Sequence, residues 1–249
     1  MAHTRAHSSR GAISCPKQAE PGDARVRLPG ERHSEELEGC EEPPVGLREI
    51  HPIFPDTLAD MAIEVRPATV FADAQTMVGP KRPDANVCWC LTYRLPSKEN
   101  LSLRGTARRA RVAGLMERGP IGVLAYDGDE VVGWAAVAPR ADKTLQCNRK
   151  IPRIDDLDVW SVWCIRVRPG YRGRGISHAL LAGAVAFARS QGAPAIEGYP
   201  VDNRGEKVDV TMAYVGTRAL FEKAGFCKAS DTASVVGGFP RVLMRLEFP

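Results

Sequence analysis

The sequence predicts an α/β fold, and three observations carry the prediction. A β-prone run over 159–167 is followed by a glycine- and arginine-rich turn and then by a long amphipathic helix. Two apolar runs, 122–126 and 131–137, flank the turn Asp127-Gly128-Asp129 as in a β-hairpin. Residues 61–67 alternate apolar and polar side chains, as a first strand does. We therefore expect strands interleaved with helices around one sheet.

Residues 1–60 differ in composition from the rest of the chain. They are rich in Pro, Gly, Glu, Arg and Ser, contain no Trp or Tyr, and show no sustained periodicity, which predicts disorder. Seven Lys and Arg face eleven Asp and Glu there, giving −4, so the +4 of the whole chain leaves +8 for residues 61–249. We expect a disordered extension over 1–60 and one folded domain over 61–249. Met61 opens the patterned sequence and is a candidate translation start.

Composition excludes several classes of protein. No run approaches the roughly 18 apolar residues of a membrane helix, and the first residues lack a secretory core. The seven cysteines are odd in number and scattered, which favours a reducing cytoplasm over a disulfide scaffold. The basic domain suits a polyanionic ligand, but no aromatic-interleaved basic patch indicates nucleic acid. We expect a cytoplasmic protein that binds neither nucleic acid nor membrane.

Other elements are predicted along the chain. Residues 69–78 form a short helix with Thr69 as a candidate N-cap, and 100–118 form a basic helix whose arginines make a solvated face. After the central helix, which Gly192-Ala193-Pro194 ends, the pattern predicts further elements. These are a strand over 195–201, a helix over 212–224 and a last strand over 241–248.

The turn between the central strand and helix has the chemistry of a phosphate site. A helix N-terminus presents unpaired N–H groups and partial positive charge, and glycines let the backbone approach a bulky anion. Arg172 and Arg174 add charge and forked donors. A nucleotide P-loop fails because Ile176 stands where its lysine must be, and a dinucleotide loop fails because His178 replaces its last glycine. A merely solvated strand-turn-helix corner is the structural alternative.

This stretch resembles the pyrophosphate-binding motif of the GNAT acetyltransferase superfamily, Q/R-x-x-G-x-G/A. Arg172, Gly175 and Ser177 fill its three positions, with Ser177 a small departure, and "IRVRPGYRGRG" is typical of the family. "ALFEKAGF" resembles the family's second CoA-contacting segment. The resemblance covers about Met61 to Phe248 in order.

The resemblance implies a GNAT fold and acetyl-CoA as cosubstrate. The sheet would be mixed and mostly antiparallel, splayed between its fourth and fifth strands and flanked by helices. The family's positions, transferred to this chain, imply a set of CoA-binding residues. They are Ile165, Val167, Arg172, Gly173, Arg174, Gly175, Ile176, Ser177 and Phe221. Backbone N–H groups around Ile165 and Val167 would polarise the acetyl carbonyl.

The catalytic residues depart from the family pattern. Phe221 stands where the family's proton-donating tyrosine belongs, so Tyr214 is the candidate acid and Tyr199 a further one. Both tyrosines can equally be pocket walls. Glu197 is the candidate general base because the family often places a carboxylate there, with Asp158 and Asp202 behind it. A strand glutamate without catalytic duty is the alternative reading of Glu197.

Cys88 and Cys90 lie in the least generic segment, 79–97. On a strand they would share one face, where free cysteines behave as small core or pocket-wall residues. A substrate role is an alternative, and a metal site would need Cys147 and Cys164 to come close. We expect no metal.

The predicted function is transfer of an acetyl group from acetyl-CoA to a primary amine by direct attack. The acceptor would be a small molecule or a peptide, and homodimerisation stays open. Because Phe221 has no proton to give, an acetyl-CoA-binding sensor with weak or no transferase activity is the alternative. A basic nucleic-acid-associated protein is a third hypothesis.

Overall fold

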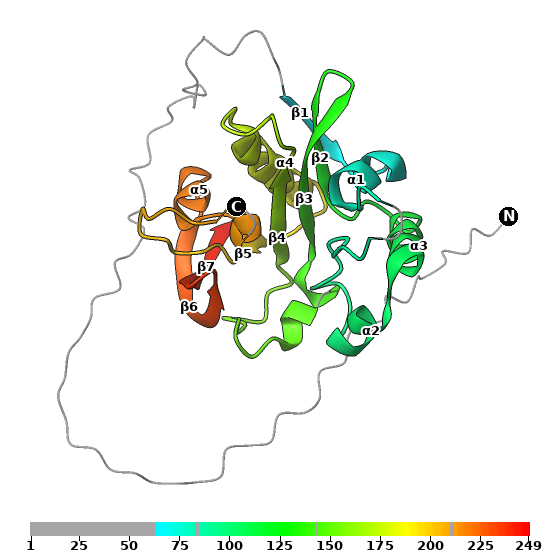
Figure 1. Ribbon diagram of the computed structural model, residues 1–249. Coiled ribbons are helices and arrows are strands. Elements are labelled where there is room, and N and C mark those ends of the chain that lie inside the picture. Colours follow the sequence, from blue (N-terminus) through cyan, green and yellow to red (C-terminus); the bar gives the residue numbers. More distant parts are fainter. Residues whose placement is uncertain (1–62, 83–84, 143, 210–211) are drawn as a thin grey trace, which may run out of the picture.

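The computed structural model describes residues 63–82, 85–142, 144–209 and 212–249 (Figure 1). The expected extension over 1–60 lies outside the described residues. The strands are β1 (Ile63–Pro67), β2 (Val123–Asp127), β3 (Glu130–Pro139), β4 (Trp160–Val167), β5 (Ala195–Gly198), β6 (Cys227–Val236) and β7 (Phe239–Glu247). The α-helices are α1 (Phe71–Val78), α2 (Ser97–Ser102), α3 (Gly105–Met116), α4 (Ile176–Ser190) and α5 (Arg218–Lys223). Short 3₁₀ turns are η2 (Arg140–Asp142), η3 (Thr144–Cys147) and η4 (Met212–Val215).

The strands form one sheet in the order β1-β2-β3-β4-β5-β7-β6 (Figure 1). All neighbouring pairs are antiparallel except β4 and β5, which are parallel. The connection between these two strands is α4, as a parallel pair requires a crossover. The prediction of a mixed, mostly antiparallel sheet flanked by helices is confirmed.

The sheet splits between its fourth and fifth strands. β4 and β5 pair only at three positions, from Trp160 opposite Ile196 to Val162 opposite Gly198. β4 then continues to Val167 beside β3, while β5 ends at Gly198 and pairs with β7. The predicted splay is therefore present, and it opens toward the turn that precedes α4.

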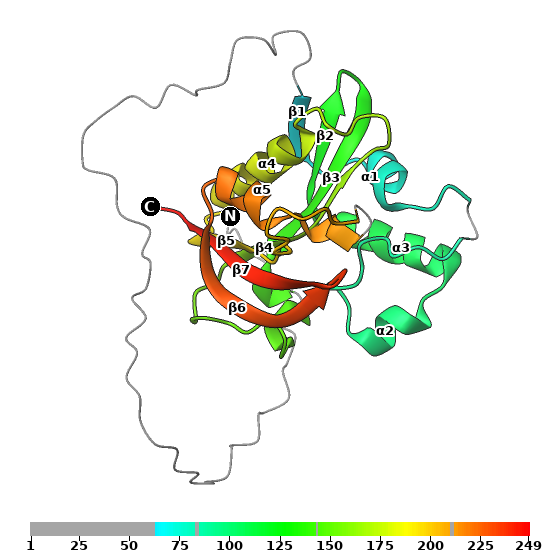
Figure 2. The ribbon, with the colours of Figure 1, turned by 60° about the vertical axis from the view of Figure 1, so that its left-hand side comes forward.

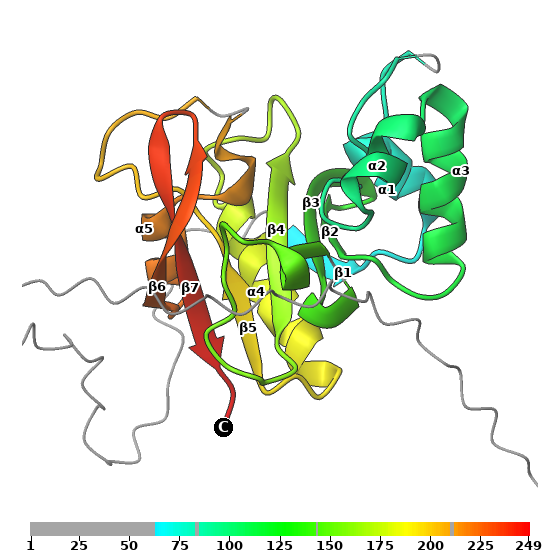
Figure 3. The same ribbon diagram turned by 90° about the horizontal axis from the view of Figure 1, so that it is seen from below.

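Helices cover the sheet from both sides (Figures 2 and 3). On one side, which we call the α4 face, α4 and α5 bury Leu180 and Phe221 against strand residues such as Ile165. On the other, the α1 face, α1 and α3 pack with the segment 87–95 against residues that include Trp134 and Trp163. The α4 face holds the helix that begins at the predicted phosphate turn.

A β-bulge in β4 shapes the α1 face beside the split. Ala136 pairs with Cys164 and Val137 pairs with Val162, so Trp163 is the extra residue. As a result Trp163 and Cys164 both belong to the core of the α1 face, whereas Val162 and Ile165 belong to the core of the α4 face. The bulge thus places two adjacent side chains on one side of the sheet.

Several local predictions were wrong. Val70, not Thr69, is the N-cap of α1. The predicted helix over 100–118 is two helices, because the chain is extended at Leu103 and Arg104. The arginines of that stretch are not all solvated: Arg108 is buried, and its guanidinium donates to the carbonyls of Leu103, Cys88 and Asn100.

The C-terminal part also differs from the prediction. The helix expected over 212–224 is broken by Gly216, at φ +83°, into η4 and α5, and the Thr217 side chain caps α5. β5 ends at Gly198, earlier than expected, and β6 was not predicted. β6 is an edge strand without a buried residue, so its sequence carries no strong apolar alternation.

No helix within the described ranges combines the length and apolar character needed to cross a membrane.

The packing of β1 against α4 depends on Gly183. A Cβ atom at this position would lie 2.3 Å from Cγ1 of Val65. We expect Gly183→Ala to lower the free energy of unfolding by about 1–3 kcal/mol, because the added methyl group would overpack the core. The matched control is Gly114→Ala in α3, where a Cβ meets nothing within 4 Å. It should raise stability by about 0.5–1 kcal/mol through helix propensity. Urea unfolding of both variants checks this, and equal effects would contradict it.

Candidate active site

The turn between β4 and α4 is built on glycines in the left-handed region. Gly170, Gly173 and Gly175 have φ of +91°, +80° and +74°, where a side chain would be strained. Gly175 is the N-cap of α4, and no side chain caps the helix. The first N–H groups of this 15-residue helix therefore point into an exposed turn, as an anion site requires.

Among the predicted CoA-binding side chains of the turn, some are held by packing or an ion pair and others are exposed. Ile176 is buried in the core of the α4 face, and Ser177 is half-buried. Arg174 bonds the Asp127 carboxylate at 3.1 Å and lies over the Tyr171 ring, which fixes the turn to the β2–β3 hairpin. Arg172 is exposed and, among the described residues, forms no ion pair. Arg172 is thus the turn guanidinium available to a phosphate.

The edge of β4 that faces the split carries backbone donors. The Arg168 N–H donates to the Val132 carbonyl on β3 at 2.9 Å. Successive N–H groups of a strand point to opposite sides, so those of Val167 and Ile165 point away from β3. β5 is not paired with β4 there. The two predicted positions therefore direct their N–H groups into the split.

Phe221 lies at the base of the split, on the α4 face. It is fully buried in α5 and packs edge-to-face on Phe226, with ring centroids 5.0 Å apart. A Cβ on Gly198, the last β5 residue paired with β4, would lie 2.0 Å from the Phe221 ring. The ring thus forms an apolar wall beside the end of β5, and it has no proton to donate.

Glu197 is held between two arginines on the α1 face. The carboxylate is 1% exposed. One oxygen accepts from Nη2 of Arg245 at 2.7 Å, and the other accepts from Arg140 and from the Tyr199 hydroxyl at 3.0 Å. Arg245 also binds the Asp155 carboxylate. Because both oxygens are occupied by cations, this geometry favours a structural role for Glu197 over the predicted role of general base.

The other candidate acids and bases, Tyr199, Asp202 and Asp158, lie in different surroundings. The Tyr199 hydroxyl lies within the same network, between Arg140 at 3.0 Å and Ser161 at 2.9 Å, and burial raises its pKa far above the ordinary value. Asp202 bonds Arg218 at 3.2 Å. Asp158 is exposed, ahead of β4 and at the opposite end of that strand from the split. Asp158 therefore lies away from the open end of the split, and Tyr199 and Asp202 are both bound to arginines.

Tyr214 lies beside the split on the α1 face. η4, to which it belongs, packs against β4, and the tyrosine is partly buried with the core that contains Cys164. Its hydroxyl interacts with that of Tyr93. Burial is the largest cause that raises the pKa of Tyr214 well above its ordinary value. The phenol is therefore protonated at neutral pH, as a proton donor must be.

Cys88 and Cys90 do not lie on a strand, so the prediction of a shared face was wrong. Trp89 and Cys90 have φ of +53° and +57°, and the turn leaves Cys88 exposed while it buries Cys90. The Cys90 thiol is hydrogen-bonded to that of Cys164; this bond, with the charge of Arg94, lowers the pKa of Cys90 to about 7. The same bond and burial raise the pKa of Cys164.

Cys90 and Cys164 are part of the core of the α1 face, so the core reading is confirmed for Cys90 but not for the exposed Cys88. Burial lowers the pKa of the neighbouring Arg94 to about 10. Within the described part of the chain, no three His, Cys, Asp or Glu side chains form a cluster able to hold a metal. Cys227, at the start of β6, is disulfide-bonded, which the scattered cysteines of the sequence did not predict.

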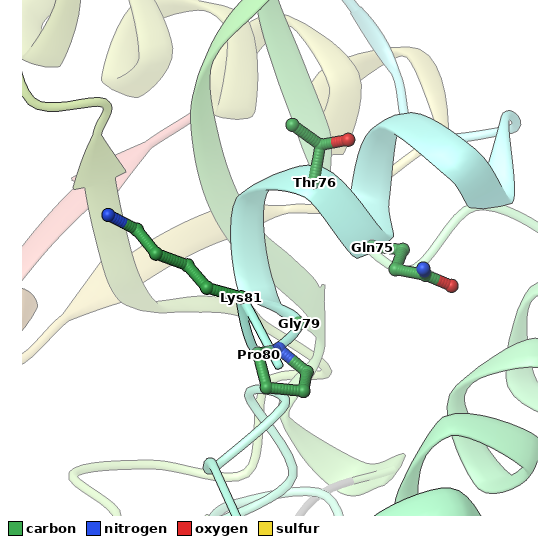
Figure 4. A pocket seen from close by; sticks show the side chains of 5 residues that line it. All are labelled: Gln75, Thr76, Gly79, Pro80 and Lys81. Atoms are coloured by element: carbon green, nitrogen blue, oxygen red, sulfur yellow. The ribbon is translucent and has the colours of Figure 1, made fainter. Parts of the chain in front are cut away.

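Sequence reasoning missed Arg140 and Arg241, and it did not join Tyr93 to either of them. Arg140 belongs to a connection that reads as polar and solvated, yet it is 4% exposed. Arg241 is 1% exposed and reads as an ordinary strand residue. No spacing rule links three residues so far apart in the chain. A hollow at the end of α1, lined by Gln75, Thr76, Gly79, Pro80 and Lys81, contains none of the predicted site residues (Figure 4).

The Glu197 network yields a prediction. We expect Glu197→Gln to lower the free energy of unfolding by about 3–5 kcal/mol, because it leaves buried guanidinium groups short of a carboxylate. Glu247→Gln is the matched control: Glu247 is exposed and 3.9 Å from Arg245, so it should have little effect. Chemical denaturation measures both. If Glu197→Gln keeps wild-type stability but flattens the pH dependence of turnover, Glu197 is a base and the structural role is wrong.

Comparison with known proteins places the chain in a family. The family model described as "Acetyltransferase (GNAT) family" matches residues 91–226. A search of curated protein sequences finds no match.

Solved structures with a similar fold include three from microbes. A GNAT-family protein from Desulfovibrio desulfuricans is 20% identical, covering 75% of this chain and 99% of its own, with a TM-score of 0.44. The PaiA N-acetyltransferase from Thermoplasma acidophilum, in complex with coenzyme A, is 16% identical over 76% and 100%, with a TM-score of 0.44. A GNAT-family acetyltransferase from Bacillus cereus is 13% identical over 76% and 99%, with a TM-score of 0.46.

Family membership rests on the sequence match, which spans more than half of the chain and includes the split, the glycine turn and α5. This chain belongs to the GNAT acetyltransferase family.

Proposed function

We propose that the protein transfers an acetyl group from acetyl-CoA to a primary amine by direct attack. The observation that carries the proposal is the split between β4 and β5, which opens directly onto the glycine turn at the N-terminus of α4. A strand edge with free donors and an anion-binding turn are thus adjacent. A thioester joined to a pyrophosphate needs this combination.

In this proposal the turn binds the pyrophosphate of acetyl-CoA. The N–H groups of Gly173 to Ser177 and the Arg172 guanidinium supply the donors, and Arg174 holds the turn to the hairpin. Ile176 anchors the start of α4. The pantetheine arm then runs along β4, where an extended chain can pair with the unpaired strand edge.

The chemistry takes place at the base of the split. The N–H groups of Ile165 and Val167 polarise the thioester carbonyl, and Phe221 packs against the cofactor as an apolar wall. The amine attacks from the α1 face in its neutral form. Because Glu197 is bound to two arginines, we assign the removal of the amine's proton to water rather than to Glu197. Tyr214 then protonates the leaving thiolate.

Phe221 supports a second candidate function, binding of acetyl-CoA without efficient transfer. One assay distinguishes the two functions. Release of free thiol from acetyl-CoA in the presence of an amine panel supports the transferase, whereas tight binding of acetyl-CoA without thiol release supports the sensor.

Arg172 should govern affinity for the cofactor phosphates. We expect Arg172→Gln to raise the Kd of acetyl-CoA about tenfold or more, the effect of one charge-assisted hydrogen bond. Binding of S-acetylpantetheine, which lacks the pyrophosphate, should not change. Arg153→Gln is the control, because Arg153 is a partly exposed arginine paired with Asp156 outside the turn. Calorimetric titration of the wild type and both variants measures these affinities. If Arg172→Gln weakens the binding of both ligands, Arg172 contributes to folding rather than to phosphate binding.

Tyr214 should control the rate of thiol release. We expect Tyr214→Phe to lower kcat about 100-fold or more with the KM for acetyl-CoA unchanged, because the thiolate leaves unprotonated. Adding Phe221→Tyr to that variant should restore part of the rate, since it returns a hydroxyl to the family's usual position. Tyr126→Phe, which removes a remote hydroxyl bound to Asp73 at 2.8 Å, is the control. An unchanged kcat in Tyr214→Phe would make that tyrosine a pocket wall.

A further inference from the structure

Three arginines are buried on the α1 face around β5 and β7, and only two are neutralised. Arg140 and Arg245 share Glu197, and Arg245 also binds Asp155. Two positive and two negative charges balance there. Arg241 is 1% exposed, but among the described residues no carboxylate lies within 4 Å of its guanidinium. Its buried positive charge is therefore left without a counterion in the described protein.

The contacts of Arg241 are neutral and incomplete. Nε donates to the Tyr199 carbonyl at 2.7 Å, and Nη1 donates to the Tyr93 hydroxyl at 2.8 Å. The rings of both tyrosines lie within 6 Å of the guanidinium carbon. Nη2 is buried and has no hydrogen-bond partner in the described part of the chain. Burying a charge and leaving a donor unsatisfied are both costly, so a site like this one favours an anion.

Arg241 lies where the split opens. It bridges to Val201, three residues beyond the last β5 residue that pairs with β4. Its partner Tyr93 interacts in turn with Tyr214, and the positive charge of Arg241 opposes the raised pKa of Tyr214. The guanidinium therefore reaches the candidate acid through a single residue. It does so on the α1 face, opposite the helix that follows the glycine turn.

We propose that Arg241 binds a carboxylate group of the acceptor, so that the substrate is a small amine that also carries a carboxylate. This inference rests on the proposed function, because it assigns the α1 side of the split to the acceptor. A guanidinium offers forked donors that match a planar carboxylate, and Nη2 is a buried donor without a partner among the described residues. Tyr93 holds the guanidinium in place and links it to Tyr214.

The test compares amines that differ only in the carboxylate. Glycine, β-alanine, γ-aminobutyrate, leucine and phenylalanine are each assayed beside the amine left by decarboxylation, with thiol release from acetyl-CoA as the readout. We expect at least one amino acid to exceed its amine in kcat/KM by about 10- to 100-fold, the range for a hydrogen bond to a charged group. The best spacing in the series reports the distance from Arg241 to the attacked carbonyl. Equal use of both members in every pair would overturn the proposal.

Variants assign the preference to Arg241. In Arg241→Gln the ratio between the two members should fall close to one, mainly through KM for the amino acid, while the KM for acetyl-CoA stays unchanged. Arg241→Lys keeps the charge without the forked donors and should give an intermediate ratio. Lys228→Gln, at an exposed position on β6, is the folding control. A ratio that survives in Arg241→Gln contradicts the assignment.

A second variant and a binding measurement cover the outcomes in which Arg241→Gln unfolds or no amine is acetylated. Tyr93→Phe leaves the guanidinium but removes its hydroxyl partner. It should raise the KM for the amino acid and leave the KM for the decarboxylated amine unchanged. The N-acetyl derivatives of the same amino acids are also titrated into CoA-saturated protein beside their neutral methylamides. Carboxylate-dependent binding that Tyr93→Phe weakens supports the site. Equal binding of acid and amide overturns it, and the CoA affinity measured alone judges the proposed function separately.

Discussion

The divergence of β4 from β5 is the constraint on which the rest of the structure depends. Pairing stops after Val162 and Gly198, and everything assigned to the site lies around the opening that follows. Glu197, in the paired part of β5, ties the strand to Arg140 from the preceding connection and to Arg245 on β7. β5 is thus bound to its neighbours at the closed end of the split, and at the open end the β4 edge that faces away from β3 is not paired with β5.

The two faces of the sheet differ in chemistry at the split. On the α4 face, Phe221 and Ile165 form an apolar wall beneath a turn rich in glycine and arginine. On the α1 face, arginines and tyrosines replace the apolar wall: Arg241 is hydrogen-bonded to Tyr93, which interacts with Tyr214. In the proposed reaction this asymmetry separates the cofactor from the acceptor.

Phe221 and Tyr214 together show how the site departs from the pattern of its family. The Phe221 ring fills the space against Gly198, so the aromatic packing is kept while the hydroxyl is absent. Tyr214 approaches from the other face, on η4, where Gly216 breaks the helix that the sequence pattern predicted. In one continuous helix, Tyr214 and Phe221 would have a fixed orientation relative to each other. The break at Gly216 lets η4 pack on β4 independently of α5.

The local pattern of the sequence determined most of the strands, the central helix and the glycine turn. Alternation, helical period and the glycines of the turn are all properties of neighbouring residues, so they can be read without the fold. The split between the fourth and fifth strands was implied by the family resemblance. Sequence reasoning could not place β6, whose residues are exposed, or the break at Leu103 and Arg104.

Only the tertiary structure decided the roles of the charged residues. Glu197, Arg140 and Arg245 are far apart in the chain, and whether a carboxylate is free or held by two guanidinium groups depends on contacts between distant segments. The same holds for Arg241, which no carboxylate of the described residues neutralises. Residue type fixes what a group can donate or accept, but burial and partners, which arise only when the strands assemble, fix whether it is available.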